Sequence, residues 1–311
     1  MLGTALAIIS TIMGGGIVSI PYAYAVEGIA TGMTVQVCVI SAIYVSCVLY
    51  LQTRLILRCS TSFGEIANLC LGSISGIILN SLIVFAIYGI LALYMILFSE
   101  IAISLIGSDE SFEDDHFLKG KTFYVCCLCT FITPFIVMKK IKDLKFTTYI
   151  LIAGVVSLLT LLTVLLIKNG SYENQVEEGI IQPEVKPANS EDENVSKFEH
   201  VVDSVNIAVA SQGFVIALFP IYASMAHSAR PKVMTSVTSA LFFTCTTYTF
   251  LSCISIAYFG QDNIKPSIFE NIQQQPGLAS VFLRCLFLLI FLCNIPFVFF
   301  AGKAALLAVV H

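Results

Sequence analysis

The sequence predicts an all-α polytopic membrane protein, on the strength of its composition and of the layout of its apolar runs. Of the 311 residues, 57% are hydrophobic and only 12% are charged, whereas about a quarter are charged in a typical soluble domain. Apolar runs long enough to cross a hydrocarbon core as helices recur along the chain. They lack the alternation of a membrane barrel, and lipid offers no partner to unpaired backbone groups, so we expect helical spans.

Eight runs qualify as spans, at about 3–25, 32–53, 74–106, 122–138, 147–167, 202–225, 233–259 and 277–301. The first contains Ala23-Tyr24-Ala25, a possible signal-peptide cleavage site, but no basic residue precedes it and Gly and Pro interrupt its apolar stretch. We therefore interpret it as a transmembrane helix. Because the chain has no Trp, an interfacial aromatic belt has to rest on Tyr residues near span ends, such as Tyr50, Tyr94 and Tyr258.

The charges of the loops predict an orientation. Lys and Arg gather in the loops after spans two, four, six and eight, whereas Asp and Glu gather in the alternate loops. By the positive-inside rule, the basic loops and the N-terminus are cytosolic, and the acidic loops face the outside or a lumen. The net charge of −4 and the lack of a basic stripe exclude a nucleic-acid partner.

One long hydrophilic segment, 168–201, separates spans five and six and is expected to be a mobile loop, since it is poor in apolar residues. It contains two glycosylation sequons, at Asn169 and Asn194, on the side predicted to be luminal during synthesis. A shorter cytosolic segment, 61–71, has apolar residues at helical spacing and is predicted to be an interfacial helix, with a plain connector as the alternative.

Spans one and six share an unusual feature, backbone-breaking residues at membrane depth. Span one carries three consecutive glycines, Gly14, Gly15 and Gly16, followed by Pro21; span six carries Ser211-Gln212-Gly213, followed by Pro220. Gly and Pro disfavour a continuous helix, and non-helical backbone is tolerated at this depth where it lines a cavity or is buried in protein. For one segment alone, close helix packing would be the simpler interpretation.

The spacing of the two segments indicates an inverted-repeat transporter. They lie five spans apart, and an odd repeat length places the second copy upside down in the membrane. Broken helices in such proteins present half-helix N-termini to a carboxylate and free carbonyls to a cation. The sequence also lacks the nucleophile elbow, the phosphate-binding loop and the paired metal-binding histidines of common enzymes, so we do not expect an enzyme.

Four stretches together resemble the amino acid/auxin permease family, closest to its sodium-coupled neutral amino acid transporters. They are the span-one run from Met13 to Ala23, the run from Pro134 to Phe146, Phe219-Pro220-Ile221-Tyr222 in span six, and Asn294-Ile295-Pro296 leading to Gly302-Lys303. The resemblance covers nearly the whole chain. It implies a LeuT-type fold of two inverted five-helix repeats plus an eleventh helix, with an amino acid held between spans one and six.

The resemblance also implies a domain organisation. Residues 1–167 would form the first repeat, 168–201 an extracellular or luminal loop, and 202–311 helices six to eight of an incomplete second repeat. The fold is therefore expected to be truncated after the eighth helix, in either a shortened or a naturally short form of a longer transporter.

Site residues carried over by the resemblance fall on the two broken spans. Substrate contacts are implied for the backbone around the glycines of span one and for the matching part of span six, with Thr11 beside them: Thr11, Gly14, Gly15, Gly16, Ser211, Gln212 and Gly213. A sodium site is implied between spans one and eight, at Ser10 and Asn294. Sodium-coupled relatives have Asn and Thr or Ser at these two places, so proton coupling stays open; both side chains offer oxygen ligands to a hard cation.

Two further residues stand out within spans. Arg284 lies about two turns inside span eight, where a charge is expensive unless it is paired or reaches water. It is either functional or a long side chain that snorkels to the interface. Tyr88, deep in span three, is a candidate to line the site, although packing is the simpler role.

These observations predict a secondary transporter that moves small neutral amino acids by alternating access, driven by Na⁺ or H⁺ and without a cofactor. The alternatives are an amino-acid-sensing receptor of the same fold and an inactive fragment of a transporter. The expected location is the plasma membrane or a vacuolar or lysosomal membrane.

Overall fold

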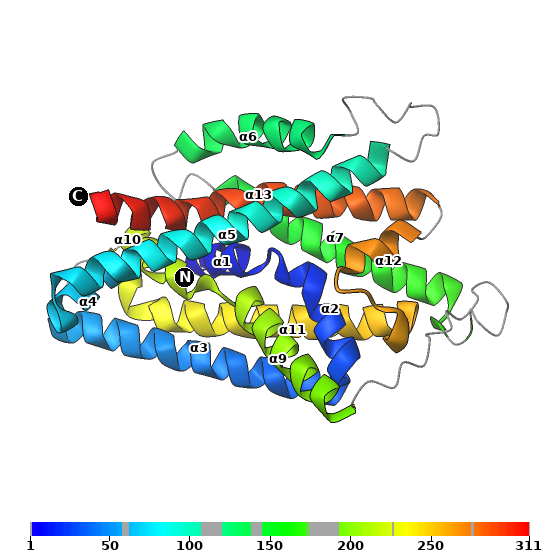
Figure 1. The fold of residues 1–311 in the computed structure, drawn as a ribbon, viewed down its shortest axis with the longest axis horizontal. Helices are drawn as coiled ribbons and strands as arrows, with labels where there is room; N and C mark the ends of the chain where they lie inside the picture. The colour runs from blue at the N-terminus through cyan, green and yellow to red at the C-terminus, as the bar shows by residue number, and fades with distance from the viewer. Residues whose placement is uncertain are drawn as a thin grey trace.

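The all-helical fold predicted from the sequence is confirmed for the part of the chain that the structure describes. This computed structural model describes residues 2–57, 62–106, 120–137, 145–172, 174, 193–225, 227–274 and 277–310. Every regular element within these ranges is a helix, most of them aligned with the long axis of the molecule (Figure 1).

Within the described residues, six helices have both the length and the hydropathy to cross a membrane: Ile29–Leu57, Ser73–Leu105, Phe146–Asn169, Glu199–Ser224, Arg230–Phe259 and Leu278–Val309. In full they correspond to α3 (Ile29–Leu57), α5 (Ser73–Ile106), α7 (Lys145–Asn169), α9 (Glu193–Ser211) with η3 (Phe214–Ala217) and α10 (Leu218–Ser224), α11 (Val233–Phe259) and α13 (Leu278–Val310). A seventh span is a broken one, α1 (Leu2–Ile12) and α2 (Gly16–Glu27), bent by 62°.

The expected span at 122–138 corresponds to α6 (Lys121–Val137), which has 17 residues. That length is just short of the roughly 18 residues needed to cross a hydrocarbon core, and the next described residue is Lys145. An eighth span therefore stays a prediction. In Figure 1, α6 lies on the outside of the bundle, beside α5 and α13.

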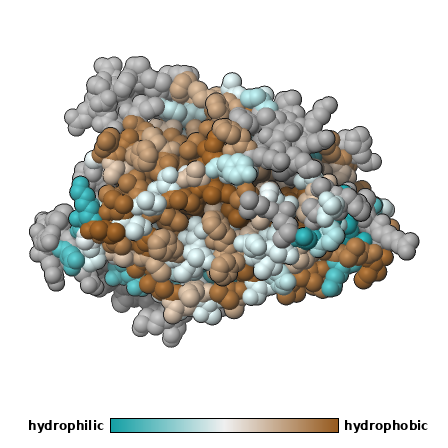
Figure 2. All heavy atoms as spheres, turned by 180° about the vertical axis from the view of Figure 1, so that it is seen from behind, coloured by the Kyte–Doolittle hydropathy of each residue, from teal (hydrophilic) through white to brown (hydrophobic). Residues whose placement is uncertain are grey.

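The broken span lies at the centre of the bundle. α1 packs against α7, α11 and α13, and α2 packs against α3, α9 and α11. The outer helices turn apolar side chains outward: Leu55 is 70% exposed and Phe85 is 81% exposed. Figure 2 shows hydrophobic residues over the middle of one face and hydrophilic residues towards its two ends. This distribution suits lipid around the waist of the molecule and water at its ends.

Short helices complete the bundle. A helix is present where one was predicted at 61–71, as α4 (Phe63–Leu71), whose N-cap Ser62 accepts a hydrogen bond from the Glu65 amide at 3.1 Å; its interfacial position stays a prediction. The others are η4 (His227–Lys232), η5 (Gln261–Asn263) and α12 (Ile268–Gln274).

The long hydrophilic segment differs from the expected loop at both of its ends. α7 extends to Asn169, and α9 begins at Glu193, nine residues before the expected span. Apolar residues at positions 195, 198, 201 and 202 recur at helical spacing there, but the charged residues between them hid the pattern. Asn194 lies in the first turn of α9, and the Asn169 side chain donates to the Tyr258 hydroxyl at 3.1 Å. Residues 175–192 lie outside the described part.

The expected aromatic belt is wrong for two of its three members. Tyr94 and Tyr258 are buried, whereas Tyr50 is at the surface. The hydroxyls of both buried residues are engaged inside the bundle, Tyr258 with Asn169 and Tyr94 with the break between α1 and α2. Distance from a span end therefore did not identify which tyrosines face the interface.

Candidate functional site

The first break, between α1 and α2, is built from glycines because neighbouring helices approach its backbone closely. α1 ends at Ile12, and the Gly14 amide turns back to donate to the Ile12 carbonyl at 2.9 Å. A Cβ added to Gly14 would collide with the Tyr94 hydroxyl and lie 2.7 Å from the Asn294 side-chain oxygen. Only glycine leaves room for these partners.

Side chains from two other helices stabilise the backbone groups that this break leaves without helical partners. The Gly15 amide donates to the Tyr94 hydroxyl of α5 at 3.0 Å. The Tyr248 hydroxyl of α11 donates to the Ile12 carbonyl, also at 3.0 Å. Both bonds replace helical hydrogen bonds in the interior of the bundle, where water is not available as a hydrogen-bond partner.

A third helix, α13, binds the end of α1. The Asn294 side-chain amide donates to the Ser10 carbonyl at 2.5 Å and to the Met13 carbonyl at 3.0 Å. Asn294 and Ser10 are both fully buried. The structure therefore brings together the two residues expected to form the cation site, from positions 284 apart in sequence.

The second break, between α9 and η3, is satisfied locally. The Gln212 amide donates to the Ala208 carbonyl at 3.2 Å, and the Phe214 amide donates to the Gln212 carbonyl at 2.8 Å. The Ser211 hydroxyl donates to the Ala208 carbonyl at 2.8 Å. The Gln212 side chain is fully buried, and neither its oxygen nor its nitrogen has a hydrogen-bond partner among the described residues.

The two breaks touch at Gly16. A Cβ added there would collide with the Ser211 Cβ and lie 2.8 Å from the Tyr248 hydroxyl. The first residue of α2 thus packs directly on the last residue of α9. The two segments singled out by the sequence, far apart along the chain, meet in one place.

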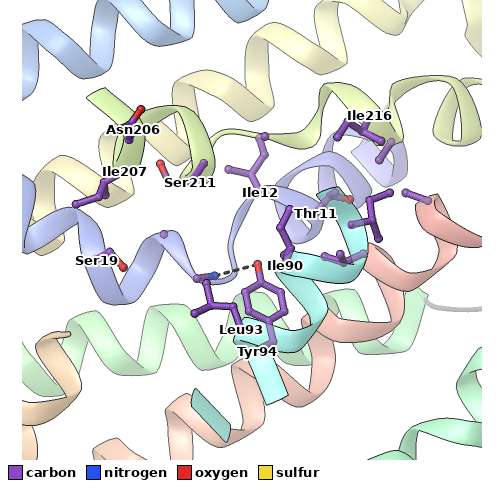
Figure 3. Close-up of a pocket in the computed structure, with 18 residues that line it drawn as sticks. Thr11, Ile12, Ser19, Ile90, Leu93, Tyr94, Asn206, Ile207, Ser211 and Ile216 are labelled. Atoms are coloured by element: carbon purple, nitrogen blue, oxygen red, sulfur yellow. Dashed lines mark hydrogen bonds between the residues drawn. The ribbon is translucent and has the colours of Figure 1, made fainter. Parts of the chain in front are cut away.

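A cavity of about 350 Å³ lies against both breaks. Its size falls within the usual range for small-molecule pockets, roughly 300–1,000 Å³. Figure 3 shows side chains from α1, α2, α5 and α9 around it. The lining residues are Thr11, Ile12, Gly15, Gly16, Ser19, Ile87, Ile90, Leu93, Tyr94, Asn206, Ile207, Ala210, Ser211, Gly213, Ile216, Ala217, Val298 and Ala301. None of these carries a formal charge, and most are apolar.

Most of the substrate-binding residues expected from the resemblance are at this cavity. Five of them line it: Thr11, Gly15, Gly16, Ser211 and Gly213. Gly14 and Gln212 belong to the breaks themselves but do not line the cavity.

Tyr88 is not brought to the cavity; Tyr94 takes that place. Tyr88 is 46% exposed, whereas Tyr94 is 6% exposed and reaches the first break. Six residues of α-helix separate two side chains by about 120° around the axis, so one faces outward when the other faces inward. In the structure Ile87, Ile90 and Tyr94 share the helix face that lines the cavity, but α5 is apolar on all sides, so its sequence carries no signal for this face.

Sequence reasoning also missed two polar lining residues, Ser19 and Asn206. Both lie about one turn from the breaks, Ser19 on α2 and Asn206 on α9. With Thr11 and Ser211 they supply hydroxyl and amide oxygens to an otherwise apolar chamber.

Arg284 does not snorkel to the interface: it is 7% exposed and hydrogen-bonded within the protein. Its guanidinium donates to the Ser104 carbonyl at 2.7 Å and to the Ser280 hydroxyl at 3.1 Å. Ser104 lies in the last turn of α5, where the helix dipole favours a cation. Arg284 lies apart from the cavity and links α13 to α5.

The bundle and its central cavity define a membrane protein of the transporter class. A family model described as "Transmembrane amino acid transporter protein" matches residues 1–310, and the chain belongs to that family. The family is one of transporters and not of enzymes. No curated protein matches the chain closely enough to count as a relative.

Proposed function

We propose that the chain binds a small neutral amino acid in the cavity between the two breaks and carries it across the membrane by alternating access. The supporting observation is the cavity itself, which touches both breaks and is lined by uncharged residues. A charged substrate side chain would find no opposite charge there, whereas an apolar or amide side chain would fit.

The substrate carboxylate would bind at the start of α2. Gly15 and Gly16 line the cavity, and Gly15, the N-cap of α2, has no side chain that could cap the helix. Its own amide is bonded to the Tyr94 hydroxyl, and the positive end of α2 lies at the chamber. The substrate ammonium would bind the side-chain oxygens of Thr11, Asn206 or Ser211. Isoleucine side chains on the opposite wall would contact the substrate side chain.

The proposed fold is a LeuT-type inverted repeat. Residues 1–167 and 202–311 would belong to the two repeats, related so that α1–α2 in the first matches α9–η3–α10 in the second. The meeting of the two breaks at Gly16 and Ser211 supports this pairing. The proposed orientation places the N-terminus in the cytosol and Asn169 and Asn194 outside, in the plasma membrane or a vacuolar or lysosomal membrane.

The coupling ion is proposed to be Na⁺, bound between Ser10 and Asn294. The Ser10 hydroxyl and the Asn294 side-chain oxygen are both buried without a hydrogen-bond partner among the described residues. Unsatisfied buried oxygens are rare, and hard cations bind oxygen ligands of this kind. Proton coupling is the alternative.

Uptake into liposomes tests the proposal. The purified chain is reconstituted, and labelled alanine or glutamine is supplied under a sodium gradient or a pH gradient imposed separately. We expect accumulation that depends on one gradient and is blocked by excess unlabelled substrate. Binding without accumulation would favour the sensing receptor, and accumulation that ignores both gradients would contradict symport.

A matched variant tests the ion site. Ser10→Ala removes one proposed ligand, and the hydroxyl has no hydrogen bond to any described residue, so the fold is expected to be unaffected. The sodium concentration for half-maximal uptake should rise about tenfold or more. Unchanged sodium dependence would exclude Ser10 as a ligand. Substrate uptake that persists in the variant would show that the proposed amino acid site does not depend on Ser10.

A further inference from the structure

A second and smaller cavity, of about 40 Å³, adjoins the cavity between the two breaks. Residues of α4, α5, α10 and α13 surround it, together with Ile216 of η3. Its walls are mostly apolar and include Phe63, Ile83, Phe219 and Ala304. It lies towards the end of the bundle at which Figure 1 shows α4 and α10. The proposed ion site and the proposed contacts to the substrate carboxylate and ammonium use none of these residues.

Two residues line both cavities, Ile216 of η3 and Ala301 of α13. The elements η3 and α13 pack against each other. Ala301 is buried, and Ile216 packs against the hydrophobic core. Because the same two side chains border both spaces, they form a partition between the larger cavity and the smaller one.

The partition closes the apolar side of the larger cavity. Figure 3 shows Ile216 on the other side of the chamber from the polar residues Ser19 and Asn206. Beside the partition, the larger cavity is lined by apolar residues, among them Ile87, Ala217 and Val298. Charged groups are costly to bury against such a wall. A substrate held by its carboxylate and ammonium at the breaks would therefore direct its side chain towards the partition.

Close packing holds the partition in place. A Cβ added to Gly302, the neighbour of Ala301, would lie 2.7 Å from the Cγ2 atom of Ile87, so α13 and α5 touch directly beside the partition. Behind it, the rings of Phe63 and Phe219 meet edge to face, with their centroids 4.4 Å apart. Interiors packed this closely resist displacement, so a longer side chain cannot simply push the partition aside.

We propose that Ile216 and Ala301 determine substrate specificity: they end the space for the substrate side chain, so the site accepts neutral amino acids with a short apolar side chain and rejects those long enough to need the smaller cavity. This inference rests on the proposed function, because it requires the amino acid to bind between the breaks. Each buried methylene group strengthens binding about fourfold. Affinity therefore rises with side-chain length up to the partition and falls beyond it.

A homologous series of amino acids measures this limit. Alanine, 2-aminobutyrate, norvaline, norleucine and 2-aminooctanoate differ only in the length of an unbranched side chain. Each competes with labelled alanine for the purified wild-type chain in detergent. Affinity should rise through the shorter members and then fall about tenfold or more at the first member that reaches the partition. The side-chain length at which affinity falls is the cut-off.

Two substitutions in the partition should move the cut-off in opposite directions. Ile216→Ala joins the two cavities, so the cut-off should move to a longer side chain, and the first member rejected by the wild type should gain about tenfold or more relative to alanine. Ala301→Val adds bulk at the partition and should move the cut-off to a shorter side chain. A partly unfolded protein would lose affinity for every member and could not produce this opposite pair of shifts.

Ile83→Ala is the matched control, because Ile83 lines the smaller cavity but not the larger one. Alone it should leave the cut-off in place, whereas combined with Ile216→Ala it should extend the cut-off beyond that of Ile216→Ala. An unmoved cut-off in both partition variants, or a shift in Ile83→Ala alone, would overturn the inference and leave the proposed function intact. A wild-type chain that binds no alanine would overturn both.

Discussion

At each of the two breaks at the centre of the molecule, backbone groups lose their helical hydrogen bonds, and the two breaks replace these bonds in different ways. The first bends the chain by 62° between α1 and α2, and hydrogen bonds from α5, α11 and α13 satisfy its backbone. The second lies within one span that runs from Glu199 to Ser224, and its backbone bonds stay within a few residues.

The difference follows from how much backbone each break exposes. A sharp bend leaves several amides and carbonyls without helical partners, and at membrane depth these must be bonded by other parts of the protein. A break with a smaller bend can bond its backbone groups to residues nearby in the sequence. The first break is therefore tied to the bundle, whereas the second contains a buried side chain, Gln212, that no described residue bonds. Changes at the first should reduce stability, and changes at Gln212 should not.

The largest effect is expected at the contact between the breaks. In Gly16→Ala, the new Cβ would collide with the Ser211 Cβ and press on the Tyr248 hydroxyl. Forced overpacking of this kind costs up to about 3 kcal/mol. The melting temperature in detergent should fall, and alanine uptake should drop below detection.

Gly89→Ala is the matched control for this substitution. Gly89 is also helical, but a Cβ added there meets no heavy atom within 4 Å. Its melting temperature should be equal or slightly higher, since Ala favours a helix over Gly by about 1 kcal/mol. Equal losses in both variants would mean that the breaks do not depend on contact at Gly16.

The next largest effect is expected for Asn294→Ala. This change leaves the Ser10 and Met13 carbonyls without their donor. An unsatisfied buried acceptor costs about 1–3 kcal/mol, so we expect a loss of about 2 kcal/mol in the free energy of unfolding, measured by denaturant titration. Asn294→Asp should restore at most one of the two bonds, because a protonated carboxyl donates a single hydrogen and an ionised one donates none. Full stability in Asn294→Ala would show that α1 does not need α13.

A smaller effect is expected for Tyr94→Phe, which removes the acceptor of the Gly15 amide and keeps the ring. The loss should be about 1–2 kcal/mol, with a higher KM for uptake, because Gly15 lines the cavity. Tyr88→Phe, on the same helix and exposed, is the matched control and should behave as the wild type does. If Tyr88→Phe lowered stability and raised KM while Tyr94→Phe did not, Tyr88 and not Tyr94 would be the site residue.

The smallest effect, of opposite sign, is expected for Gln212→Leu. It replaces two buried polar atoms that bond to no residue in the described ranges by an apolar group of similar volume, which should raise the free energy of unfolding by about 1 kcal/mol. Substrate affinity should fall if Gln212 bonds the bound amino acid. Loss of stability would show that Gln212 already has a partner, and would remove the contrast between the breaks.

The breaks themselves could be predicted from the sequence because their cause is local. Three consecutive glycines in span one and Ser-Gln-Gly in span six disrupt a helix whatever surrounds them. The partners could not be predicted from the residues alone: Tyr94 and Tyr248 lie 79 and 236 positions from the groups they bond. The Ser10–Asn294 pairing was expected only through family resemblance.

Side-chain direction was the other limit. The apolar run of α5 is hydrophobic on every face, so it carries no amphipathic signal to say whether Tyr88 or Tyr94 faces inward. The burial of Arg284 could not be predicted either, because its partner, the Ser104 carbonyl, belongs to the end of a helix that is distant in the sequence.

The bond from Arg284 to Ser104 also has a mechanical consequence. It fastens the end of α5 to the beginning of α13, two helices from the opposite halves of the chain. α5 and α13 also pack extensively against each other, so a motion that preserves this bond carries the two helices together. The bond therefore couples the two halves of the chain through one pair of helices.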